Sequence, residues 1–148
     1  MTEELWARVA AWPVARLATV GPGGRPHLVP CCFALDGPGS GVSPEGDVAY
    51  SAVDSKPKRS EQLRRLENVR ANPAVCLLVD HYEDDWSALW WVRLDGRGRL
   101  VEAGPERSRA LELLCAKYAQ YRRNPPGGPV LAIDITGWRS WSGGPSRP

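Results

Sequence analysis

The stretch ARLATVGPGGRPHLVPCCFAL, residues 15–35, reads as two strands joined by a tight turn. Its first six residues alternate apolar and polar side chains only roughly, as in a strand that is buried largely on both faces. The following Gly21-Pro22-Gly23-Gly24 is rich in the residues that reverse a chain. Residues 26–35 are again strand-like and would form the returning strand. The sequence therefore predicts a β-hairpin over residues 15–35.

Outward from the hairpin, the pattern predicts further strands and several helices. Strands are expected at residues 48–51, 75–79, 89–102 and 130–135, the long one either continuous or bulged at Asp95-Gly96. Helices are expected at residues 3–12, at residues 60–70 and after Gly104-Pro105, where proline occupies the first helical position. About six strands with short connections and few intervening helices are typical of an antiparallel barrel with peripheral helices. The prediction is a mainly β chain that forms one domain over residues 1–148.

Composition excludes several classes of protein. The chain has 148 residues, with 19 Lys and Arg against 17 Asp and Glu, so its net charge is only +2. Its four cysteines include no C-x-x-C pair, which indicates reduced thiols and neither a disulfide framework nor structural zinc. No apolar run is long enough to cross a membrane, and the acidic start MTEE lacks the positive charge of a signal peptide. We expect a cytoplasmic protein without a membrane partner or a metal.

Positive charge is concentrated in one segment. Residues 56–70 carry six Lys or Arg against two Glu, a local charge of +4. Lys56, Lys58 and Arg59 lie just before or at the start of a predicted helix, where unpaired N–H groups also attract an anion. One interpretation is therefore a phosphate site. The alternative is a solvated helix face, which we prefer for the cations farther along, Arg64, Arg65 and Arg70.

The common catalytic motifs are missing from the sequence. There is no G-x-S-x-G nucleophile elbow, and GPGGRP lies between two strands and not before a helix, where a phosphate-binding loop would be. His27 and His81 have no evident acid-base partner, so each is more simply a surface or hydrogen-bonded histidine. If the protein is an enzyme, we expect a bound cofactor to supply the reactive group.

The order of four segments resembles the split-barrel flavoprotein superfamily. These are the hairpin, DVAYSAVDSKPK (47–58), LENVRANPAVCLLVD (66–80) and WSALWWVRLDGRGRLVE (86–102). That superfamily contains pyridoxamine 5′-phosphate oxidase and actinobacterial relatives that use the deazaflavin coenzyme F420. The resemblance covers about residues 12–103. It implies a six-stranded antiparallel split β-barrel of the FMN-binding type, an obligate homodimer with two cofactor sites between its subunits.

The resemblance also implies which residues meet the cofactor. The returning hairpin strand would line the ring, the Tyr50-Ser51 step would contact it, and the loop that follows would bind phosphate. Trp91 stands where the oxidase has a glutamine that reaches across the dimer, a departure that fits the F420 branch better than the FMN branch. The implied cofactor-binding residues are Val29, Pro30, Cys31, Cys32, Tyr50, Ser51, Ser55, Lys56, Lys58 and Trp91.

Local chemistry leaves alternatives open at several of these positions. Small Cys31 and Cys32 side chains let a flat ring approach the backbone. Pro30 has no N–H to pair with a neighbouring strand, which fits a groove that holds a planar ligand and, equally, an ordinary edge-strand proline. Trp90 and Trp91 must point to opposite faces of a strand, and we assign Trp90 to packing and Trp91 to the cofactor groove. Trp138 and Trp141 either close the groove or cover the barrel end, and Arg93 either pairs with an acid or meets phosphate.

These residues favour one function over three others. We expect an F420-dependent oxidoreductase that passes hydride to a small organic acceptor. An FMN-binding relative of pyridoxamine 5′-phosphate oxidase is the second choice, and a non-catalytic cofactor-binding protein is the third. A nucleic-acid binder is least favoured, because the basic segment has no interleaved aromatic residues.

Overall fold

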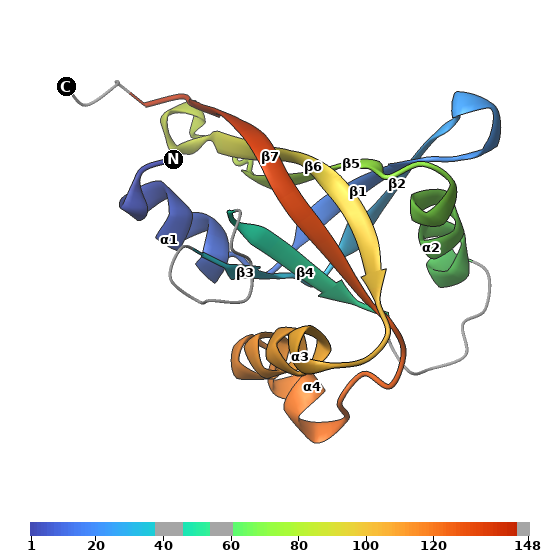
Figure 1. Ribbon diagram of the computed structural model, residues 1–148. Coiled ribbons are helices and arrows are strands. Elements are labelled where there is room, and N and C mark those ends of the chain that lie inside the picture. Colours follow the sequence, from blue (N-terminus) through green and yellow to red (C-terminus); the bar gives the residue numbers. More distant parts are fainter. Residues whose placement is uncertain (38–45, 54–60, 145–148) are drawn as a thin grey trace.

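The structure, a computed structural model, describes residues 1–37, 46–53 and 61–144, with residues 61–63 described by their backbone alone (Figure 1). The strands are β1 Ala15–Val20, β2 Pro26–Cys31, β3 Ala34–Asp36, β4 Val48–Ala52, β5 Ala74–His81, β6 Trp90–Val101 and β7 Val130–Ser142. The α-helices are α1 Glu3–Ala11, α2 Glu61–Ala71, α3 Pro105–Lys117 and α4 Ala119–Arg123. No helix in these ranges is long and apolar enough to cross a membrane.

All the described strands join one antiparallel sheet in the order β2-β1-β5-β6-β7-β4-β3. The predicted hairpin is confirmed, with Ala15 opposite Cys31 and Val20 opposite Pro26. The returning strand, however, is divided: β2 pairs with β1, whereas β3 pairs with β4. The sheet therefore has seven strands instead of the six expected. No strand pairing in the described part of the chain joins the two edge strands, β2 and β3, to each other.

A row of apolar side chains across the sheet sets the strand register. Leu17 of β1 lies opposite Leu77 of β5, which lies opposite Leu94 of β6, and all three are fully buried. Val29 and Trp138 extend the row at its two ends. A slip of one residue would turn these side chains to the other face. Since burying each leucine contributes about 1.5–3 kcal/mol, the core specifies this pairing strongly.

Helix α2 lies against β1 and β6 (Figure 1). The buried Asn68 amide donates a hydrogen bond to the buried Thr19 hydroxyl over 3.0 Å, which ties this helix to β1. Its Leu66 and Val69 are also buried, so one face of the helix belongs to the core.

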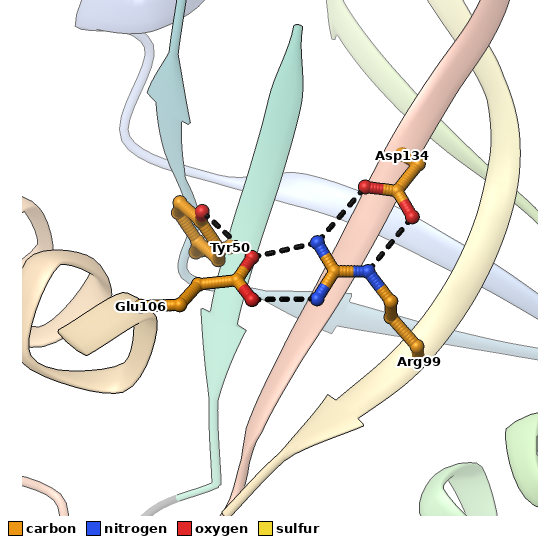
Figure 2. Close-up of polar contacts among 4 residues, drawn as sticks. All are labelled: Tyr50, Arg99, Glu106 and Asp134. Atoms are coloured by element: carbon orange, nitrogen blue, oxygen red, sulfur yellow. Dashed lines mark hydrogen bonds and ion pairs between the residues drawn. The ribbon is translucent and has the colours of Figure 1, made fainter. Parts of the chain in front are cut away.

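A four-residue polar network fixes the start of α3 to the sheet (Figure 2). The Arg99 guanidinium of β6 bonds both carboxylate oxygens of Glu106 over 2.7 and 2.6 Å, and both of Asp134 over 2.8 and 3.0 Å. The Tyr50 hydroxyl of β4 donates to Glu106 over 3.1 Å. The hydrogen bonds from Arg99 hold the pKa of Glu106 below its ordinary value. Arg99 thus bonds two carboxylates at once, and the network keeps one negative charge in excess.

The long strand β6 is continuous, the first of the two alternatives expected, and the register shift at Asp95-Gly96 arises in its partner β7. Asp95 lies opposite Gly137 and Gly96 opposite Ile135, so Thr136 is the extra residue of a bulge on β7. A Cβ atom on Gly96 would lie 2.6 Å from the Asp134 carbonyl oxygen, which is backbone and cannot easily move. Gly96 therefore permits the close approach of the two longest strands.

We expect Gly96→Ala to lower the free energy of unfolding by about 1–3 kcal/mol, because the added methyl group overlaps β7. Urea denaturation followed by circular dichroism measures this change. Gly137→Ala is the matched control in the same bulge, since its added methyl group would meet no atom within 4 Å. Equal destabilisation by the two substitutions would contradict the close-contact explanation.

We expect Glu106→Gln to lower the free energy of unfolding at neutral pH by about 1.5–3 kcal/mol, the range for a hydrogen bond to a charged group. Because the pKa of Glu106 is lower in the folded protein, its stabilisation is present above about pH 4.5 and is lost as the pH falls further. The difference between wild type and variant should therefore shrink in acid. Glu112→Gln, on the exposed face of the same helix, should change stability by less than about 0.5 kcal/mol.

Candidate functional site

The four residues expected to line a cofactor ring lie at the end of edge strand β2. Val29 packs partly against the core, Pro30 is exposed, Cys31 is 7% exposed and Cys32 is half-buried just beyond the strand. Pairing with β1 continues through Pro30, which lies opposite Arg16. Because β2 is at the edge of the sheet, Pro30 is an edge-strand proline, and the other side of the strand carries no sheet partner among the described residues.

Cys31 of β2 lies close to Ser51 of β4, and the charge of Arg65 of α2 acts on the Cys31 thiol. All three are buried, with exposed fractions of 7%, 3% and 8%. Burial raises the pKa of the Cys31 thiol to about 11, against the opposing effects of the Ser51 hydroxyl and the Arg65 charge. The Ser51 hydroxyl has no hydrogen-bond partner of normal geometry among the described residues, although it lies close enough to interact with that thiol. A buried hydroxyl without a regular partner beside a buried cation suits a polar or anionic ligand.

Tyr50, the neighbour of Ser51, has a different environment. It is fully buried, and its hydroxyl donates to Glu106 in the network that anchors α3. Burial, reinforced by the Glu106 charge, raises its pKa well above the ordinary value for tyrosine. Its hydroxyl proton is therefore used in the hydrogen bond to Glu106. The expected contact of this hydroxyl with a cofactor stays a prediction.

The expected phosphate-binding residues Ser55, Lys56 and Lys58 lie outside the described residues. Of the cations assigned to a solvated helix face, Arg64 and Arg70 are exposed, and Arg70 forms an ion pair of 3.5 Å with Glu102. Arg65 does not fit that interpretation, because it is buried. Its spacing gave a signal that we did not use: it precedes buried Asn68 and Val69 by three and four residues, which places it on the inner face of the helix.

Trp91 lies on the outer face of β6, opposite its buried neighbour Trp90. Trp90 packs edge-on against Trp12 with ring centroids 4.9 Å apart, so its packing role is confirmed. Arg93, two residues beyond Trp91, forms an ion pair of 2.9 Å with Asp95 of its own strand. Trp138 packs partly against the core, while Trp141 is 45% exposed.

Trp91 borders two hollows on the surface of the protein. The first, of about 290 Å³, is lined by Leu78, Asp80, Tyr82, Trp91 and Arg93. The second, of about 670 Å³, lies between the start of α1 and the ends of β6 and β7, where Arg8 and Trp141 also line it. An exposed aromatic wall of this kind is characteristic of a contact surface or a ring-binding groove.

A larger cavity, of about 1020 Å³, lies between the hairpin turn and α2. Arg25 and His27 line it from the hairpin, and Arg64, Glu67 and Asn68 line it from the helix. It lies at the opposite end of β2 from Cys31, so β2 runs from this cavity to the buried cysteine.

The second histidine has an acid partner that sequence reasoning missed. The imidazole Nε2 of His81 bonds the carboxylate of Glu83, two residues away, and its ring packs edge-on against Trp12 at 5.5 Å. The turn that follows β5 brings the two side chains together. Neither residue lies among those expected to hold a cofactor.

Solved structures from several bacteria share this fold. A conserved hypothetical protein of Mycobacterium tuberculosis aligns with a TM-score of 0.71 and 22% identity, over 97% of this chain and 86% of that one. A FAD-binding protein of Mesorhizobium loti gives 0.62 and 22%, over 95% and 92% of the two chains. A heme-binding protein of Mycobacterium smegmatis gives 0.68 and 20%, over 95% of this chain and 54% of that one. At such identities, the likeness shows a common fold.

No curated protein matches the chain. A family model described as pyridoxamine 5′-phosphate oxidase matches residues 1–142, which is almost the whole sequence. The mainly antiparallel sheet with its peripheral helices agrees with that match. The chain therefore belongs to the pyridoxamine 5′-phosphate oxidase family.

Proposed function

We propose that this protein is an oxidoreductase that binds coenzyme F420 along β2 and transfers hydride to a small organic acceptor. The observation that carries the proposal is the buried Ser51 hydroxyl, which has no regular hydrogen-bond partner among the described residues and lies against the Cys31 thiol. The charge of buried Arg65 acts on the same thiol. Polar groups buried in this way are usually satisfied by a ligand or by water. Membership of a flavin-using family makes a redox cofactor the preferred ligand.

The described residues fit such a group. The edge strand offers the backbone of Val29, Cys31 and Cys32 without bulky polar side chains, so a flat ring can lie against it. Ser51 would donate a hydrogen bond to the ring or its side chain, and Arg65 would balance negative charge near the start of α2. Ser55, Lys56 and Lys58 would bind the phosphate, where charge-assisted hydrogen bonds contribute about 1.5–3 kcal/mol each.

In the proposed reaction, the protein contributes by positioning the cofactor and the acceptor. When bound, the deazaflavin supplies the hydride, which is the reactive chemistry of the site. The protein holds the ring and the acceptor face to face and excludes water from the space between them. The raised pKa values of Cys31 and Tyr50 make neither group a ready acid at neutral pH, so product protonation is left to solvent.

A homodimer is part of the proposal, with Trp91 contributing from the partner copy to the cofactor groove. The support is the outer face of β5 and β6, where Leu78 and Trp91 are half-buried and Tyr82 is 66% exposed. Large apolar side chains gathered around a hollow of this kind commonly mark a protein interface.

An FMN-binding relative of pyridoxamine 5′-phosphate oxidase remains the second candidate. The family description and the FAD-binding protein of Mesorhizobium loti favour it, since both point to ordinary flavins. Trp91 favours the deazaflavin instead. It stands where the oxidase has a glutamine, and an indole N–H only donates a hydrogen bond, whereas a glutamine amide both donates and accepts. The third candidate, a non-catalytic cofactor-binding protein, would bind its cofactor at the same residues.

Titration of the purified protein with F420 and with FMN decides between the two. We expect saturable quenching of F420 fluorescence with one cofactor per subunit, together with a dimer in sedimentation equilibrium. Tighter binding of FMN than of F420 would favour the second candidate, the FMN-binding protein. A monomer that binds neither would reject the proposed function. Binding without oxidation of the reduced cofactor across a panel of acceptors would indicate a carrier.

We expect the double substitution Lys56→Ala and Lys58→Ala to weaken cofactor binding at least tenfold, because two charge-assisted contacts with phosphate are lost. The control is Arg97→Ala with Arg123→Ala, which removes the same charge from exposed positions on β6 and α4. Circular dichroism checks that both variants are folded. Unchanged affinity in the first double variant would rule out these lysines as the phosphate site.

A further inference from the structure

Two residues between β2 and β3 belong to neither strand ladder. The pairing of β2 with β1 ends at Cys31, and the pairing of β3 with β4 begins at Ala34. Cys32 and Phe33 therefore have no sheet partner within the described part of the chain, although Phe33 is fully buried. Buried backbone groups need partners from elsewhere, and these two residues directly follow the strand proposed to carry the cofactor ring.

The end of α3 supplies the missing partners. The Phe33 amide donates to the Tyr118 hydroxyl oxygen over 3.0 Å, and the Lys117 ammonium donates to the Phe33 carbonyl over 2.9 Å. The Tyr118 hydroxyl lies 2.9 Å from the Pro13 carbonyl and 3.0 Å from that of Phe33. Since Lys117 already serves the latter, the hydroxyl proton is free for Pro13. Three backbone groups are thus satisfied by two adjacent side chains.

The Phe33 side chain is held by the same lysine. The Lys117 nitrogen lies 3.7 Å from the centre of the Phe33 ring, in position for a cation–π contact. Burial lowers the pKa of Lys117 to about 8, against the opposing effects of the Cys32 and Cys31 thiols. The ammonium is still mostly charged at neutral pH, so it strengthens both the hydrogen bond and the ring contact.

The Cys32 thiol lies next to this contact. The Cys31 thiol interacts with Ser51, while the Cys32 thiol interacts with Tyr118, and the charge of Lys117 acts on both thiols. A rotation of the backbone at Phe33 would displace the Cys32 thiol, because Cys32 lies outside both ladders, whereas Cys31 is still paired with Ala15.

Other contacts of α3 anchor the helix, and they can be changed separately from the contacts of Lys117 and Tyr118 with Phe33. Glu106 at its start joins Arg99, and Arg109 in its middle joins Asp36 over 3.3 Å. Arg107 donates to the carbonyls of Pro126 and Gly128 before β7, over 3.2 and 3.1 Å. These contacts stabilise the helix without touching Cys32 or Phe33.

We propose that Lys117 and Tyr118 are positioning residues, which hold the backbone at Cys32-Phe33 so that the end of β2 presents a fixed surface to the cofactor ring. The inference rests on the proposed function, because it assigns these two side chains a task at that same site. Neither residue needs to touch the cofactor. Their effect passes through the backbone of Phe33.

The test compares four variants. Tyr118→Phe removes the hydroxyl but keeps the ring packed against Tyr121, whose centroid is 5.6 Å away. Lys117→Met removes the charge and the donor, and Lys117→Arg restores both. Arg107→Met is the matched control, since it removes a cation-to-carbonyl contact from the same helix.

Two measurements are made on each variant. Hydrogen exchange of the peptide that contains residues 31–34 reports on the backbone without any cofactor. Titration with F420 and with FMN, with the absorption band of the bound cofactor, reports on the site.

We expect exchange in this peptide to accelerate at least tenfold in Tyr118→Phe and Lys117→Met, and cofactor affinity to fall about tenfold with a shifted absorption band. Lys117→Arg should recover both properties, and Arg107→Met should leave both unchanged even if its melting temperature falls. Faster exchange with wild-type affinity and spectrum would overturn the positioning role, as would unchanged exchange. Failure of the wild-type protein to bind either cofactor would instead reject the proposed function, while the exchange data would still decide whether the two side chains hold the segment.

Discussion

The division of one strand into β2 and β3 is the constraint on which the rest of the structure depends. Its two halves pair with strands at opposite ends of the sheet order, yet only Cys32 and Phe33 separate them in the chain. A link of this length spans at most about 11 Å. The end of β2 and the start of β3 must therefore lie close together although these strands are at opposite ends of the sheet order. The sheet bends accordingly, and the row of leucines across β1, β5 and β6 is fully buried.

The same division creates the conditions for a site. An edge strand that stops before its continuation leaves backbone groups without ladder partners, and side chains from helices take over. Lys117 and Tyr118 do this from α3, while Arg65 approaches Cys31 and Ser51 from α2. A single substitution can remove a side chain that holds the backbone, whereas it cannot remove the backbone hydrogen bonds of a strand ladder. Substitutions can therefore test these contacts one at a time.

Several features were predictable because they depend on local chemistry. The turn at residues 21–24 and the flanking strands follow from glycine, proline and apolar runs, and the structure contains that hairpin. Alternation along a strand separated buried Trp90 from half-buried Trp91. Arg65 was misjudged because its charge was weighed more heavily than its spacing from Asn68 and Val69, and the acid partner of His81 was missed because a turn brings it close.

The sequence by itself determined the strand-rich pattern, the hairpin and the resemblance to a cofactor-binding family, because each rests on residues that are neighbours in the chain. Only the tertiary structure decided that the returning strand divides and that Arg65 turns inward. It alone decided that Tyr50 commits its hydroxyl to Glu106 and that the end of α3 holds Phe33. Those outcomes depend on which polar groups become buried together, and partners 56 and 84 residues apart are not visible in local patterns.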